Sequence, residues 1–322
     1  MFKDAKREAI TASLIADGGQ AEPDLLAMTK GEIPRGQAFE EPRSRFYESQ
    51  RLRLHYVVWG DERRPPLLLL HGGRDHCRSW DLVAPAFKDR YTVYAPDLRG
   101  HGDSQWALGG MYSLPEFVLD LATLANALEG PLILVGHSLG GAIALQYAGV
   151  FPERVAKVVA IEGLGPPVIE HRPADERMRQ WVDHMHSVEE RRLRRYRSLE
   201  EAVRRMLEVN PHLSLEMALH LTAHGSRRNE DGTYSWKFDN YVRIHSPYEF
   251  NLRDAQDIWS QIRVPVLLLK GAESPWGDAD RDGRAQVIPN HRTAVFERAG
   301  HWLHHDQRDR FLQVVGDFLE QP

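Results

Sequence analysis

The chain has 322 residues, of which 42% are hydrophobic and 27% are charged, and this supplies enough apolar material for a substantial buried core. The formal net charge of -5 and the pI near 6.4 exclude the basic surface that nucleic-acid binding requires. One cysteine excludes an internal disulfide framework, and no apolar run is long enough to cross a membrane. We therefore expect a cytoplasmic globular protein that binds neither nucleic acid nor membrane.

The N-terminal half of the chain begins with an extension and continues with strand patterns. Residues 1–45 hold a Gly, Pro and Glu-rich passage after a short amphipathic stretch, and their role stays open. Residues 44–58 alternate apolar and polar side chains, which predicts a hairpin. A continuous apolar run at 66–70 is typical of a strand buried on both faces. A helix over 79–87 and a strand over 91–95 are expected next.

The following elements alternate between helix and strand. The spacing of apolar residues predicts a helix over 114–128, a buried strand over 132–135, a helix over 142–147 and a buried strand over 155–161. This alternation indicates the α/β class, with a doubly wound and mostly parallel sheet. The loops at the carboxyl ends of the strands should therefore carry the chemistry.

The pattern changes between residues 164 and 259, where several prolines are followed by charge-rich helical segments without a buried strand. We interpret this segment as a mainly helical cap inserted after the sixth core strand. The core then comprises residues 46–163 and 260–322, with strands expected at 264–269 and 293–296 and a terminal helix at 309–319. Whether the cap or the extension pairs two chains into a homodimer is left open.

The most informative stretch is Gly136–Gly140, with the sequence GHSLG, which follows the buried strand and precedes a helix. Two glycines around one serine are typical of a nucleophile elbow, a sharp turn that holds the serine in a strained conformation. The turn would place Ser138 at a helix N-terminus, which favours a developing negative charge. We therefore predict that Ser138 is a nucleophile.

A serine hydroxyl needs a general base, and the base needs an acid that orients it. His301 follows the last predicted strand in the segment AGHW, where a loop can bring it over the carboxyl edge of the sheet. His304 and His305 are neighbouring competitors, but they are expected to begin the approach to the terminal helix. His301 is therefore the predicted base.

Four motifs in this order resemble those of the α/β-hydrolase superfamily: the HGG turn at 71–73, the segment DLRGHGDS at 97–104, the GHSLG elbow and the late Gly300–His301 pair. The similarity spans about residues 45–320 and points to a capped, esterase-like serine hydrolase. It implies a Ser-acid-His triad in that chain order and hydrolysis as the chemistry. Serine at position 138 disfavours the dehalogenase and epoxide hydrolase branches, which use aspartate there. The 97–104 segment resembles a scaffold loop without a catalytic role.

The acid departs from the common family pattern, because the turn after the seventh strand reads Gly271-Ala272-Glu273-Ser274 and has serine where aspartate is usual. Some capped relatives take their acid from the end of the preceding strand, where Glu162 stands here. A lone carboxylate closing a buried strand is costly without a partner such as histidine. We therefore favour Glu162 as the acid. Alternatives in the later loop are Asp278 first, and Glu273 or Asp280.

The resemblance implies an oxyanion hole built from the backbone N–H groups of Gly73 and Leu139. Candidate substrate contacts are Arg74, next to the oxyanion turn, and three apolar side chains of the cap: Trp181, Met185 and Trp236. An arginine-rich run at 191–197 is interpreted as a solvated helix face. No metal-ligand spacing stands out, and the predicted reaction needs no cofactor.

These features predict a serine hydrolase that cleaves a carboxylic ester or thioester of small-molecule size through an acyl-enzyme intermediate. The same triad also serves hydrolases that cleave a carbon–carbon bond or a lactone, because the fold does not determine the substrate. A catalytically idle ligand-binding protein is the alternative from another class. The intact serine and histidine favour an enzyme.

Overall fold

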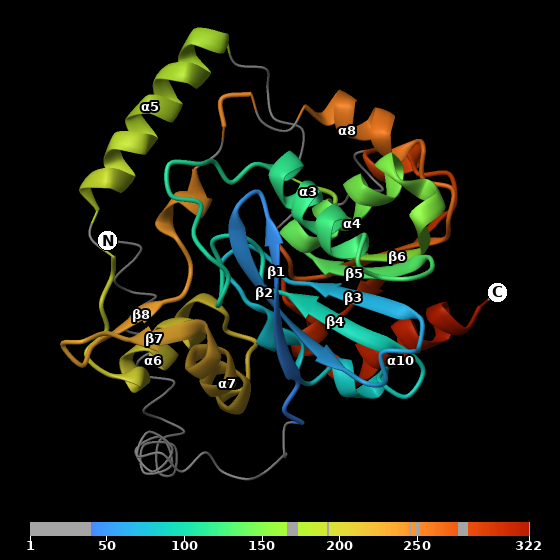
Figure 1. Cartoon of the computed structure of the whole chain (residues 1–322), viewed down its shortest axis with the longest axis horizontal. Coiled ribbons are helices and arrows are strands. Elements are labelled where there is room, and N and C mark those ends of the chain that lie inside the picture. Colours follow the sequence, from blue (N-terminus) through green and yellow to red (C-terminus); the bar gives the residue numbers. More distant parts are fainter. Residues whose placement is uncertain are drawn as a thin grey trace.

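The computed structural model describes residues 40–165, 173–191, 193–244, 246–248, 251–275 and 283–321. Most of the predicted N-terminal extension lies outside these ranges. Within them, the chain folds around one large sheet with helices on both faces, and a second group of helices lies beside it (Figure 1). No helix among these residues combines the length and the apolar character that crossing a bilayer requires.

The large sheet has eight strands in the order β1-β2-β4-β3-β5-β6-β9-β10. Strands β1 and β4 pair antiparallel with β2, and all other pairs are parallel, as expected for an α/β sheet. The bounds are β1 Arg43–Ser49, β2 Leu52–Trp59, β3 Pro66–Leu70, β4 Thr92–Pro96, β5 Leu132–His137, β6 Val155–Ile161, β9 Val266–Gly271 and β10 His291–Phe296.

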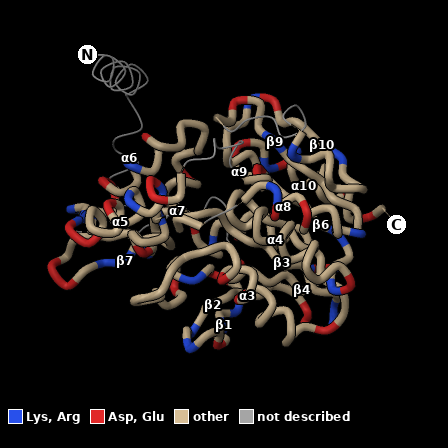
Figure 2. The backbone as a smooth tube through the Cα atoms, turned by 90° about the horizontal axis from the view of Figure 1, so that it is seen from above, with Lys and Arg blue, Asp and Glu red and all other residues tan. Residues whose placement is uncertain are grey.

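Both faces of the central strands are buried. In β3, Leu68 and Leu70 enter the core under helices α3 (Leu114–Ala125), α4 (Leu139–Val150) and α8 (Leu252–Trp259), whereas Leu67 and Leu69 enter the core on the other face. That second core is closed by α9 (Leu303–Asp306) and α10 (Arg308–Glu320). Figure 2 shows that charged residues lie mainly at the periphery of the chain. Successive side chains of a strand point to opposite faces of the sheet. Because both faces are buried here, the sequence of these strands is apolar without interruption.

The helix predicted for residues 79–87 is wrong. The structure has two short 3-10 turns there, η1 at Cys77–Trp80 and η2 at Ala84–Ala86. Pro85 explains the break, because proline has no N–H to donate and disfavours a helical conformation in the residue before it. The side chains of Trp80 and Val83 are nevertheless fully buried in the core, which is why the apolar spacing imitates a helix.

The segment between β6 and β9 is mainly helical. It contains α5 (Ala174–Glu190), α6 (Leu199–Val209), α7 (Leu215–Gly225), a hairpin of β7 (Ser226–Arg228) and β8 (Tyr234–Trp236), the 3-10 turn η4 (Asn240–Arg243) and α8. Helix α5 has no buried residue and stands away from the sheet, whereas α8 packs on α4 of the core (Figure 1). The hairpin was not expected, since its strands have only three residues each.

The arginine-rich run does not form a helix face. Helix α5 ends at Glu190, Arg191 is its C-cap residue, and Tyr196 pairs with Tyr234 in an isolated β-bridge. The interpretation of the run as one solvated helix face is therefore wrong. The charged residues after Glu190 resemble those of the helix before it, so the sequence did not indicate that the helix ends there.

Candidate active site

Ser138 lies at the sharp turn between β5 and α4, with a left-handed φ of 51° and a ψ of -114°. Its N–H donates a hydrogen bond to the carbonyl of Ile161 at 2.7 Å, which ties the turn to the end of β6. A Cβ atom on Gly136 would lie 2.2 Å from the carbonyl oxygen of Gly140, and one on Gly140 would lie 2.2 Å from that of Leu70. Only glycine fits at both positions, so backbone crowding holds the serine in its strained conformation.

The turn predicted to supply an oxyanion donor runs beside Ser138. A Cβ atom on Gly72 would lie 3.3 Å from the Cβ of the serine, whereas one on Gly73 would meet nothing within 4 Å. Gly73 is exposed, and Leu139 is the first residue of α4. The backbone on one side of the serine is therefore packed, and the side at Gly73 opens to a space that a substrate can enter.

His301 lies in the turn between β10 and α9. The turn is held by two contacts: the N–H of Gly300 donates to Oδ2 of Asp306 at 2.8 Å, and Nε2 of His137 lies 2.9 Å from the carbonyl oxygen of His301. The imidazole rings of His137 and His301 are 4.7 Å apart. The residue before the serine in the elbow thus positions the backbone of the predicted base.

Glu162 follows β6 with a left-handed φ of 52°, and its carboxylate is held from the neighbouring strand end. The N–H of Gly271 donates to Oε1 at 2.7 Å, and the hydroxyl of Ser274 donates to Oε2 at 3.0 Å. Oε2 also lies 4.0 Å from Nδ1 of His301, within ion-pair distance. The serine that replaces the usual aspartate therefore hydrogen-bonds the carboxylate of the preceding strand.

Burial shifts the pKa of both partners toward their neutral forms. Burial raises the pKa of Glu162, and the hydrogen bonds from Gly271 and Ser274 oppose that rise. Burial, together with the positive charge of Arg74, lowers the pKa of His301 to about 4. His301 is thus neutral at pH 7, which is the state that a general base requires.

The alternative acids and bases lie elsewhere or outside the described residues. Glu273 is 3.3 Å from Nε2 of His212, and Asp278 and Asp280 fall outside the described ranges. The ring of His304 stacks on Trp80 at 4.9 Å, and Nε2 of His305 lies 3.0 Å from the hydroxyl of Ser79. Both histidines on α9 therefore contact η1 on the core.

A pocket lies between the core and the segment that follows β6. Its lining includes the predicted residues Arg74 and Trp236, together with Asp75, Lys237, Phe238 and Trp302, which the sequence interpretation missed. Trp181 and Met185 lie on α5 and are not among the described residues that line it. Trp302 directly follows His301, so its place in the pocket lining could have been predicted from its position next to the predicted base. Nothing in the sequence marked Lys237 or Phe238.

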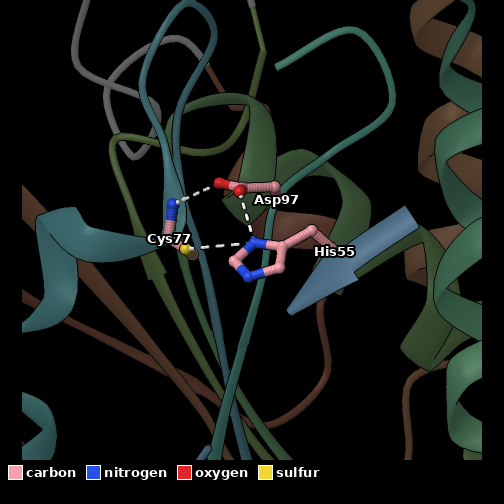
Figure 3. A group of neighbouring side chains, drawn as sticks. All are labelled: His55, Cys77 and Asp97. Atoms are coloured by element: carbon pink, nitrogen blue, oxygen red, sulfur yellow. Dashed lines mark hydrogen bonds and ion pairs between the residues drawn. The ribbon is translucent and has the colours of Figure 1, made fainter. Parts of the chain in front are cut away.

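Two groups of side chains among the described residues have the donor types of a metal site. In the first, Oδ1 of Asp97 accepts from the N–H of Cys77 at 2.7 Å, and Oδ2 lies 2.7 Å from Nδ1 of His55 (Figure 3). Burial raises the pKa of the Cys77 thiol, which disfavours the thiolate that a metal needs. This buried network instead fixes the 97–104 loop, in agreement with a scaffold role.

The second group is Asp81 with His220 and His224 on α7. Nε of Arg78 already donates to both carboxylate oxygens of Asp81, at 2.9 and 2.7 Å. A metal ion would have to displace this guanidinium, so the donor set does not fit a resident metal.

Comparison with known proteins identifies the family. Residues 67–314 match the alpha/beta hydrolase family. Esterase Rv0045c of Mycobacterium tuberculosis is 28% identical, over 81% of this chain and 85% of its own. A 2-hydroxy-6-oxo-2,4-heptadienoate hydrolase of Pseudomonas putida is 28% identical, over 83% and 91%. The thioesterase domain from the curacin biosynthetic pathway superposes with a TM-score of 0.75 at 24% identity, over 86% and 99%. The chain belongs to the alpha/beta hydrolase family and is a hydrolase.

Proposed function

We propose that the protein hydrolyses carboxylic esters or thioesters through an acyl-enzyme intermediate, with Ser138 as nucleophile, His301 as general base and Glu162 as the acid that orients it. The observation that carries the proposal is the strained serine at the N-terminus of α4, next to a turn whose Gly73 side is open. Helix N–H groups at this position favour a negative charge that develops on the substrate.

In the first half of the reaction, the hydroxyl oxygen of Ser138 attacks the carbonyl carbon while His301 accepts its proton. The N–H groups of Gly73 and Leu139 donate to the resulting oxyanion. His301 then gives the proton to the leaving alkoxide or thiolate, which leaves Ser138 acylated. In the second half, His301 takes a proton from water, and the resulting hydroxide attacks the acyl carbonyl carbon. The bond to the Ser138 oxygen then breaks, His301 returns its proton to that oxygen, and the carboxylic acid leaves. Each step uses only side chains and backbone groups of this chain.

A carbon–carbon bond hydrolase on the same triad is the second candidate. The similarity to the 2-hydroxy-6-oxo-2,4-heptadienoate hydrolase of Pseudomonas putida supports it, just as the similarity to the Mycobacterium esterase supports ester cleavage. An idle ligand-binding protein is disfavoured, because such a protein has no use for a serine held in a strained conformation, which costs roughly 1–3 kcal/mol.

The test is hydrolysis of nitrophenyl esters of increasing acyl length by the wild type and by Ser138→Ala, whose folding is checked by thermal unfolding. We expect turnover that depends on the serine and falls by at least about 10³-fold in the variant. Turnover of the folded variant near the wild-type rate would contradict the proposal. If no ester is cleaved although a fluorophosphonate labels Ser138, the carbon–carbon candidate takes its place.

A further inference from the structure

Three arginines near the pocket have no acidic partner among the residues that the structure describes. Arg74, Arg191 and Arg243 are exposed, and within the parts of the chain that the structure describes none of them contacts a carboxylate. Other arginines of the same region are paired: Arg195 contacts Asp231, and Arg205 contacts Glu208 at 2.9 Å. The chain as a whole is acidic, with a net charge of -5, yet these three arginines lie close together without a carboxylate among the described residues. Such a local excess of positive charge indicates a site for an external anion.

One of these arginines, Arg74, lines the pocket, and Arg243 contacts a lining residue. Arg74 follows Gly73 directly, lines the pocket together with Phe238 and has a left-handed φ of 66°. A left-handed conformation is strained for an arginine. The guanidinium of Arg243 lies over the ring of Phe238, 5.3 Å from its centroid. Arg243 therefore contacts a residue of the pocket that Arg74 lines, and α5, whose C-cap is Arg191, contacts the turn η4 that holds Arg243.

The charges of these residues act on one another. Burial, followed by the charges of Arg74 and Arg191, lowers the pKa of Arg243, and Arg74 also lowers that of His301. Lys237, the other cation of the pocket lining, is 2.8 Å from Asp103 and so has an acidic partner. Burial raises the pKa of Asp75 to about 7, so this carboxyl group is only about half ionised at pH 7. The positive charge beside the predicted base is therefore not fully neutralised within the described residues.

We propose that Arg74 and Arg243 bind a carboxylate of the substrate, so that the preferred substrates are anionic esters or thioesters. The inference rests on the proposed function and names its substrate class. Arg191 adds to the positive charge, but its place at the carboxyl end of α5 has its own explanation, because a cation there stabilises the helix. The test therefore uses Arg74 and Arg243.

The experiment compares nitrophenyl hexanoate with the nitrophenyl monoester of adipic acid, which has the same acyl length and one carboxylate. A third substrate, the hexanoate ester of a carboxylated nitrophenol, carries the charge on the leaving group. Comparing the two anionic esters identifies the side of the ester bond that faces the arginines. Reactions with Ser138→Ala are subtracted, because the monoester also hydrolyses by itself.

We expect the wild type to have a higher kcat/KM for one anionic ester than for hexanoate. Arg74→Gln and Arg243→Gln should each lower this preference by about tenfold or more, since hydrogen bonds to a charged group contribute about 1.5–3 kcal/mol. Arg74→Lys should restore part of the preference, and added salt should weaken it. The matched control is Arg227→Gln, an exposed arginine that stacks on Trp106, is not among the residues that line the pocket and should leave the preference unchanged.

A wild-type preference for hexanoate that neither arginine variant changes would overturn the inference and leave the esterase proposal intact. If no ester is cleaved, the esterase proposal fails, and the anion site is tested by calorimetry of adipate binding to Ser138→Ala. Binding that Arg74→Gln and Arg243→Gln weaken in this background supports the site, whereas the absence of binding, or binding that both substitutions leave unchanged, overturns it.

Discussion

Ser138 and Glu162 end neighbouring strands with nearly the same left-handed φ, 51° and 52°, yet different contacts hold them in place. The serine is fixed by backbone that is too crowded for any side chain on Gly136 or Gly140. The glutamate is fixed by hydrogen bonds from Gly271 and Ser274 on the next strand end. No residue larger than glycine fits at the two crowded positions. The carboxylate of Glu162, in contrast, could accept its hydrogen bonds from other donors. The elbow of this chain should therefore tolerate substitution less than the support of the proposed acid does.

The largest effect should come from removing the charge of the acid. Glu162→Gln keeps the shape but cannot stabilise an imidazolium, so we expect kcat on the best ester to fall by about 10³-fold or more. Asp278→Asn is the control and should leave kcat at the wild-type value. The comparison breaks if the ranking of these two variants is reversed, because the acid would then belong to the loop after β9.

Crowding at the elbow is tested by Gly140→Ala. The new Cβ would meet the carbonyl oxygens of Leu70 and His71, at 2.2 and 2.7 Å. Because both contacts are backbone, we expect a loss of about 1–3 kcal/mol in the free energy of unfolding, measured in urea, together with lost activity. Gly316→Ala on α10 is the matched control, since its Cβ meets nothing within 4 Å. Equal stability of the two variants would show that the elbow is less crowded than we infer.

The smallest effect is expected from Ser274→Ala, which removes one of the two hydrogen bonds to Glu162. We expect kcat/KM to fall by about tenfold or less, in line with the modest net contribution of one such bond. The bond stabilises the charged carboxylate, so its loss raises the pKa of Glu162 and moves the acid limb of the pH profile to higher pH. The pKa of His301 is lowered to about 4, so His301 stays neutral where Glu162 titrates, and the limb reports the glutamate. An unmoved limb would remove Ser274 from the support of the acid.

Much of the core could be predicted from the sequence because its signals are local. The apolar runs of β3, β5, β6 and β9 are short, continuous and buried on both faces, so each run is sufficient to identify a strand. The glycines of the elbow are an equally clear signal in the sequence, because only glycine fits sterically at these positions. The same reasoning fails at residues 79–87, where apolar spacing and a proline give opposite indications.

The contacts that complete the site could not be predicted because they join distant segments. Ser274 supports Glu162 across 112 residues, and the pocket residues Lys237 and Phe238 approach Arg74 only through the fold. The end of α5 was missed as well, since an exposed charged helix has no apolar pattern whose loss marks its last residue. The sequence therefore indicated which residues form the candidate site, but not which residues they contact.

The hydrogen bond between the His137 ring and the carbonyl of His301 has a consequence for protein engineering. The second position of the G-x-S-x-G motif, His137, joins the strand of the proposed nucleophile to the loop of the proposed base at 2.9 Å. Grafting the pentapeptide onto another hydrolase would transfer the serine without this link. A transplant, or a library randomised at position 137, should therefore vary residues 300–306 in parallel.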